Sequence, residues 1–96
     1  MELIFTDEAT EMLVSVSLFI EQKWSLKEAD KFLAQAYKTF DLLLKHPYIF
    51  KASSLDQNIR VGIISKQCSF FYEIKESQIV ILFLWDNRQE PIFLKT

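Results

Sequence analysis

Apolar residues recur every three or four positions along two neighbouring stretches of the N-terminal half. The first set comprises Ala9, Met12, Leu13, Val16, Phe19 and Ile20. The second set comprises Ala29, Phe32, Leu33, Ala36, Tyr37, Phe40, Leu43 and Leu44. This spacing places each set on one face of an α-helix.

The ends of both helices carry recognisable signals. Thr6 or Asp7 can cap the first helix, whose pattern runs to about residue 24. Ser25 and Glu28 fit a capping box at the start of the second helix, and Pro47 ends it. Because almost nothing separates the two helices, we expect a helical hairpin whose apolar faces share one core.

The C-terminal half changes to a period of two. Runs rich in Ile, Val, Phe and Tyr occupy Ile59–Ser65, Ser69–Lys75 and Ile79–Asp86, with short polar turns between them. Such short links join antiparallel neighbours. With the apolar run Leu3–Phe5 added as an edge strand, the sequence predicts an α+β fold of order β-αα-βββ. In this fold the helical hairpin packs on one face of a small antiparallel sheet, and residues 1–96 form a single domain.

Both alternating sets of the last strand are apolar. Strict alternation gives one side Ile79, Ile81, Phe83 and Trp85, and the other Val80, Leu82 and Leu84. A sheet with one solvated face would instead alternate apolar and polar residues. Half of the chain is hydrophobic, which is more than a domain of this size comfortably buries alone. We therefore expect the C-terminal tail, a partner protein, or both to cover the second face.

Composition excludes several classes of function. The net charge is −2 and the isoelectric point is near 5.3, so the chain lacks the positive field of a typical nucleic-acid binder. One histidine, His46, and one cysteine, Cys68, are too few for a zinc site, and Cys68 is better explained as a small buried residue than as a nucleophile. A single glycine, Gly62, excludes a glycine-rich phosphate loop. We expect no cofactor and no metal.

The same composition bears on location. No signal peptide is evident, and the longest apolar run, Ile79–Trp85, is far shorter than the roughly 20 residues that span a bilayer. The lone cysteine also favours a reducing compartment. We expect a cytoplasmic protein without a membrane segment.

Five pieces of the sequence, in this order along the chain, together carry a family resemblance. They are Trp24–Phe32, His46-Pro47, Ile59-Arg60, Phe71–Ile74 and Trp85–Pro91. The chain resembles the RelE/ParE superfamily of bacterial type II toxins, which includes plasmid stabilisation proteins. The resemblance implies a growth-inhibiting toxin held in a hetero-oligomeric complex with a small antitoxin. RelE-like members cleave mRNA on the ribosome, whereas ParE-like members poison DNA gyrase.

In the ribonuclease branch, basic residues on the sheet surround the scissile phosphate. The resemblance makes Arg60 and Arg88 the candidate catalytic residues, because they fall near two of those basic positions. Gly62 and Ser69 stand where two further basic residues are expected, and Tyr72 matches a structural tyrosine of the family. These departures favour the ParE-like branch over an mRNA endoribonuclease.

The C-terminal tail departs from the ribonuclease pattern as well. Phe93 or Leu94 stands where that branch has its catalytic tyrosine. We expect Trp85, Phe93 and Leu94 to contact the partner protein instead. The antitoxin is expected to add a helix against the hairpin and an extended segment along the sheet.

Three alternatives remain open. The arginines can be purely structural. Arg60 would then pair with Asp56 or Glu73, and Arg88 with Asp86 or Glu90. The chain can also be an active RelE-type ribonuclease, or a toxin-fold protein that has lost toxicity and serves as a binding module.

Overall fold

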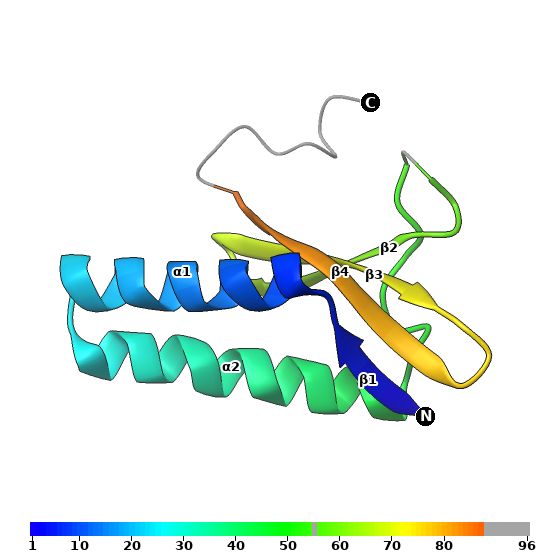
Figure 1. Ribbon diagram of the computed structural model, residues 1–96, viewed down its shortest axis with the longest axis horizontal. Coiled ribbons are helices and arrows are strands. Elements are labelled where there is room, and N and C mark those ends of the chain that lie inside the picture. The colour runs from blue at the N-terminus through cyan, green and yellow to red at the C-terminus, as the bar shows by residue number, and fades with distance from the viewer. Residues whose placement is uncertain (55, 88–96) are drawn as a thin grey trace.

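The computed structural model describes residues 1–54 and 56–87 of the chain. The elements follow in the order β1 (Glu2–Phe5), α1 (Asp7–Lys23), α2 (Leu26–Lys45), β2 (Arg60–Ser65), β3 (Cys68–Ile74) and β4 (Gln78–Asp86) (Figure 1). This confirms the predicted α+β order, and each strand boundary lies within one residue of the expectation.

Thr6 both starts α1 and ties it to the sheet. Its hydroxyl oxygen accepts a hydrogen bond from the N–H of Ala9 at 3.0 Å. The same hydroxyl donates to the carbonyl of Leu82 in β4 at 2.6 Å. One side chain therefore caps the helix and fixes its first turn against the last strand.

Ser25 caps α2, but only half of the predicted capping box forms. The hydroxyl of Ser25 accepts from the N–H of Glu28 at 3.1 Å. The N–H of Ser25 donates to Ile20 at 3.3 Å, and the Glu28 carboxylate pairs with Lys31 at 3.5 Å. The tight turn after α1 thus supplies the acceptor that a full capping box would take from Glu28.

The strands lie in the order β1-β4-β3-β2. The meander of β2, β3 and β4 is antiparallel, as the short turns predict. β1 lies at the sheet edge, also as expected, but it runs parallel to β4, so the sheet is mixed. The parallel direction is possible because the whole helical hairpin separates β1 from the meander.

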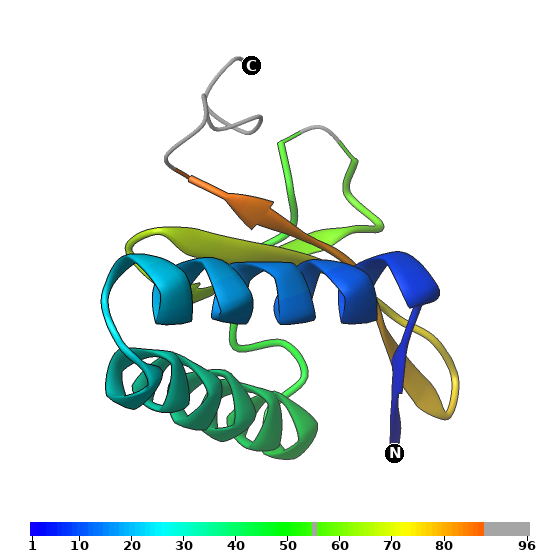
Figure 2. The ribbon, with the colours of Figure 1, turned by 60° about the vertical axis from the view of Figure 1, so that its left-hand side comes forward.

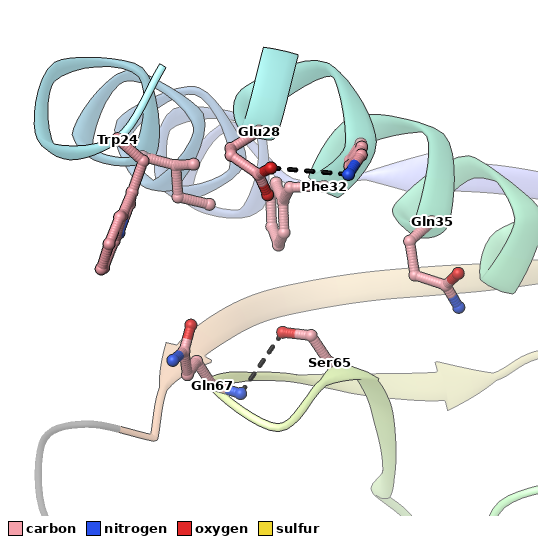
Figure 3. A pocket seen from close by; sticks show the side chains of 8 residues that line it. Trp24, Glu28, Phe32, Gln35, Ser65 and Gln67 are labelled. Carbon is pink, nitrogen blue, oxygen red and sulfur yellow. Dashed lines mark hydrogen bonds and ion pairs between the residues drawn. The ribbon is translucent and has the colours of Figure 1, made fainter. Parts of the chain in front are cut away.

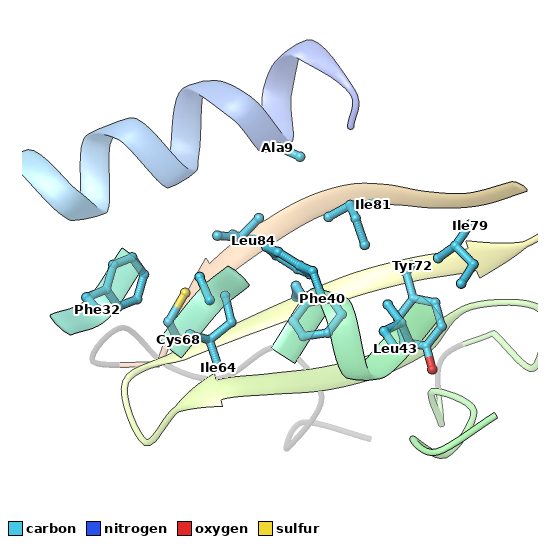
Figure 4. Packing of buried hydrophobic residues seen from close by; sticks show 12 residues of the cluster. Ala9, Phe32, Phe40, Leu43, Ile64, Cys68, Tyr72, Ile79, Ile81 and Leu84 are labelled. Atoms are coloured by element: carbon cyan, nitrogen blue, oxygen red, sulfur yellow. The ribbon is translucent and has the colours of Figure 1, made fainter. Parts of the chain in front are cut away.

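A β-bulge in β4 changes which side chains face the helices. The pairing with β3 skips Leu82, so this strand carries one extra residue. Leu84 therefore joins Ile79 and Ile81 in the core (Figure 4). Strict alternation placed Leu84 on the opposite side from Ile81, and that expectation is wrong because the bulge reverses the alternation.

The core lies between the hairpin and one face of the sheet (Figure 2). The ring of Phe40 in α2 meets Phe5 and Phe70 edge-on, with ring centroids 5.1 and 5.2 Å apart. Two residues of the predicted apolar faces, Phe19 and Tyr37, are exposed instead. α1 and α2 thus bury narrower stripes than the sequence pattern indicated.

The opposite face of the sheet is also covered at its centre. Phe71 lies between two residues that face the helices, so its ring points to the other side. The ring stacks on Phe83 at 4.5 Å between centroids and is only 2% exposed. Phe93 and Leu94, which we expected to help cover this face, lie outside the described residues.

Candidate functional site

Arg60, the first candidate catalytic residue, opens β2 and is half-buried. Its guanidinium donates a hydrogen bond to the carbonyl of Phe50 at 2.5 Å. It also lies over the ring of Tyr48, with 4.7 Å between its Cζ atom and the ring centroid. A backbone bridge joins Arg60 to Ala52. These contacts hold the segment between α2 and β2 against the sheet.

The ion pairs predicted for Arg60 do not form. A carboxylate oxygen of Asp56 accepts from the backbone N–H of Asn58 at 2.8 Å, and Glu73 pairs with Lys75 at 3.9 Å. Within residues 1–54 and 56–87, Arg60 makes no ion pair. The predicted acidic partners of Arg60 are therefore wrong. At the start of β2, its guanidinium meets the carbonyl of Phe50 and the ring of Tyr48 instead.

Tyr72 pairs with Arg60 across β2 and β3. Its side chain is fully buried, and its hydroxyl donates to the carbonyl of Pro47 at 2.9 Å. Burial raises the pKa of Tyr72, while the positive charge of Arg60 opposes the shift. A neutral hydroxyl that holds Pro47, two residues beyond the end of α2, fits a structural tyrosine rather than a base.

Two positions that the resemblance assigns to basic residues are closed to them. A Cβ atom on Gly62 would lie 2.2 Å from Cζ of Phe70, so a side chain there would force this buried ring to move. Ser69 is fully buried, and its hydroxyl accepts from the side-chain amide of Asn87 at 2.8 Å. Arg88, the other candidate catalytic residue, lies outside the described residues. The sheet therefore offers no RelE-like set of cations at these positions.

A cavity of about 600 Å³ opens where the turn of the helical hairpin faces the β2–β3 turn. In Figure 3, Trp24 and Phe32 point from the helices toward the opposite side, where Ser65 and Gln67 lie. Trp24 is 67% exposed, so it does not belong to the core. A lining of rings, amides and one surface ion pair suits protein contact better than bond-making chemistry.

A second cavity, of about 370 Å³, separates α1 from the last half of β4. It is lined by Glu8, Glu11, Met12, Ser15, Phe83, Leu84 and Trp85. Trp85, which we predicted to bind a partner, is half-buried. Its indole N–H is buried and has no acceptor among the described residues. Glu8 and Glu11 lie in the first turns of α1, and nothing in their spacing along the sequence indicates what lies opposite them.

The outer side of the hairpin carries a third apolar surface. Val14 and Leu18 of α1 and Tyr37 of α2 are each about half exposed, and they line a cavity of about 190 Å³. Large apolar side chains in such a row exceed the scattered exposure that is normal for a small domain. This surface fits the expectation that a partner covers part of the chain.

The hairpin, the mixed sheet and these apolar surfaces define a small α+β domain of the RelE/ParE type. A sequence profile of the family described as "ParE toxin of type II toxin-antitoxin system, parDE" matches residues 3–91. The chain belongs to this family of toxins. The earlier resemblance is thereby confirmed and narrowed to its ParE branch.

The fold comparison agrees with the family. The chain is similar to one in the solved structure titled "Chromosomal ParDE TA system from P. aeruginosa", with a TM-score of 0.78 and 17% sequence identity. The match covers 90% of this chain and 95% of that chain. The comparison with curated proteins found no match.

The described part of the chain also bears on membrane and metal binding. No helix in the described ranges combines the length and apolar character needed to cross a membrane. Over the same part of the chain, no three His, Cys, Asp or Glu side chains gather as a metal site would require.

Proposed function

We propose that this protein inhibits bacterial growth by binding DNA gyrase, and that a small antitoxin neutralises it by forming a hetero-oligomeric complex with it. Family membership supports the toxin class. The observation that carries the choice of mechanism is the contact between Gly62 and Phe70, which excludes a cation from a position that RNA cleavage of the RelE type would need. The guanidinium of Arg60 already bonds the Phe50 carbonyl, and this also favours gyrase binding over RNA cleavage.

The target is tested by inducing the chain alone in a bacterial culture. DNA and protein synthesis are followed by pulse labelling, and supercoiling by purified gyrase is measured with added toxin. We expect replication to fall before translation, and supercoiling activity to fall with toxin concentration. Cleaved mRNA, with translation failing first, would favour the ribonuclease instead. Folded protein with no effect on growth would favour a binding module without toxicity.

The arginines are tested in the same culture. Arg88→Ala is the informative variant for catalysis, because Arg60→Ala also removes a contact that holds the α2–β2 segment. On the gyrase mechanism, neither arginine performs bond cleavage, so purified Arg88→Ala protein leaves mRNA as intact as the parent does. A parent that cuts mRNA and an Arg88→Ala protein that does not would contradict the proposal.

The antitoxin is tested by co-expression with the product of the neighbouring gene. We expect a stable complex, recovery of growth, and loss of that recovery when partner contacts are removed. We place Trp85, Phe93 and Leu94 among those contacts. The support for Trp85 is its position in the lining of the cavity between α1 and β4.

A further inference from the structure

β1 accompanies β4 over only half of its length. The pairing ends at Phe5 with Ile81, and the N–H of Thr6 makes the last backbone bond, to the carbonyl of Ile81 at 3.1 Å. The chain then turns away as α1 (Figure 1). β4 continues to Asp86, and within the described residues this second half pairs on one side only, with β3. We call the stretch from Phe83 to Trp85 the open edge of β4.

The open edge presents unpaired peptide groups. Alternate residues of a strand turn their N–H and C=O groups to opposite sides, so part of this stretch faces away from β3. Apart from its bonds to β3, no backbone hydrogen bond of Phe83, Leu84 or Trp85 occurs within the described residues. An exposed row of this kind is a template for another strand.

The cavity between α1 and β4 lies along this open edge. Successive side chains of a strand point to opposite faces, yet Phe83, Leu84 and Trp85 all line the same cavity. A cavity touched by three consecutive residues must lie at the strand's edge. Its other wall is a single face of α1, formed by residues at positions 8, 11, 12 and 15.

The charge and apolar character of the cavity lining indicate the chemistry of a suitable occupant. Glu8 and Glu11 are exposed and make no ion pair within the described ranges, and the first thirty residues hold seven acidic and two basic residues. Met12 and Phe83 add apolar surface beside the carboxylates. The indole N–H of Trp85 lacks an acceptor, which is the group that the backbone of an added strand brings.

We propose that an extended, basic segment of the antitoxin adds to the open edge of β4 as a fifth strand. Its backbone pairs with Phe83–Trp85, a Lys or Arg side chain lies at Glu8 and Glu11, and an apolar side chain enters the cavity. This inference rests on the proposed function, since the occupant is the antitoxin. It adds the position of the segment and the charge that the segment must carry.

A second copy of the chain fits this edge less well. Two copies that pair through their open edges are related by two-fold symmetry, so each brings the same acidic wall to the interface. The carboxylates of Glu8 and Glu11 would then meet their equivalents, and such like-charge contacts oppose association. A basic partner segment instead gives the two carboxylates of each toxin chain favourable contacts.

Hydrogen exchange of the co-expressed complex tests the backbone pairing. In the complex with the product of the neighbouring gene, we expect the outward-facing amides between Phe83 and Trp85 to exchange roughly tenfold more slowly than in the toxin alone. The amides of β2, at the other edge of the sheet, serve as the internal reference. A stable complex in which the amides of β4 are unchanged overturns the inference and leaves the proposed function standing. Failure to form any complex overturns both.

Charge reversal tests the partner's chemistry. We expect the double variant Glu8→Lys, Glu11→Lys to bind the same antitoxin roughly tenfold more weakly, with a reduced dependence on salt. The matched control is Asp7→Lys, Glu21→Lys, which makes the same charge change on α1 at exposed positions outside the cavity lining. Equal affinity of the two double variants overturns the inference. So does a concentration-dependent dimer of the toxin alone that protects the same amides, because it assigns the edge to a second copy.

Discussion

The two helices of the hairpin are close in length but unlike in what they bury. α2 places Ala29, Phe32, Ala36, Phe40 and Leu43 in the core, whereas Ala9 is the one fully buried apolar residue of α1. α1 nevertheless carries apolar side chains on several sides, including the exposed Val14 and Leu18. A helix that keeps apolar residues it does not bury is suited to a partner. The comparison teaches that α2 anchors the core with fully buried side chains, whereas α1 packs on it mainly through partly buried ones.

The largest effect is expected from truncating Phe40, the aromatic side chain at the centre of the core face of α2. Phe40 is 2% exposed and contacts the rings of Phe5 and Phe70. We expect Phe40→Ala to lower the free energy of unfolding by about 3–5 kcal/mol, through lost burial and the cavity left behind. Urea denaturation followed by circular dichroism measures it. A loss no larger than that of an exposed residue would show that α2 does not hold the core.

The helix caps sharpen the comparison, because one cap side chain also bonds the sheet and the other does not. Thr6 caps α1 and also bonds the Leu82 carbonyl of β4, whereas Ser25 caps α2 alone. We expect Thr6→Ala to cost about 2 kcal/mol of unfolding free energy and Ser25→Ala about 1 kcal/mol. The same denaturation experiment compares them. Equal losses would mean that the bond to β4 contributes nothing to stability.

The hydrogen bond that holds the segment after α2 makes a smaller, pH-dependent contribution to the free energy of unfolding. The hydroxyl of Tyr72 donates to Pro47, and burial raises the pKa of Tyr72 in the folded protein. A raised pKa means that this contribution is complete below the unfolded pKa, roughly 10, and is lost as the pH rises through the folded value.

We expect Tyr72→Phe to cost about 1 kcal/mol at neutral pH and to remove part of the stability loss above pH 10. Thermal unfolding of both proteins between neutral and alkaline pH checks this. Identical slopes for the two proteins would show that another group controls the alkaline loss.

The smallest stability effect is expected on the outer side of α1. Val14 and Leu18 are exposed, so Val14→Ser with Leu18→Ser should change the unfolding free energy by less than about 1 kcal/mol. Toxicity or antitoxin binding should nevertheless fall, which is measured by growth arrest and by titration of the purified complex. Unchanged binding and unchanged growth arrest would remove the binding role assigned to this side of α1.

The sequence predicted the elements well because their signals are local. Ser25 and Pro47 mark the ends of α2, and the change of period from three or four to two separates the helices from the meander. The partners of Arg60 were not predictable in this way. Its contacts with Phe50 and Tyr48 depend on how the α2–β2 segment folds back, and the segment carries no periodic pattern.

The candidate partner surface was predicted only in part. Trp85 was predicted as a partner contact because both sides of the last strand are apolar, and it lines the cavity between α1 and β4. The bulge at Leu82 was missed, since an extra residue in a strand leaves no signature when both neighbouring sides are apolar. Glu8 and Glu11 were missed as well, because their role depends on β4 lying opposite them, more than sixty residues later in the chain.

The parallel pairing of β1 with β4 also sets the order in which the protein can fold during synthesis. The hydroxyl of Thr6 bonds a carbonyl 76 positions further along the chain. Contacts of such long range form late, and this one cannot form until β4 has left the ribosome. The surface shared by α1 and β4 therefore forms only after β4 has been translated, so the N-terminal half of the toxin waits for the C-terminal half to complete it.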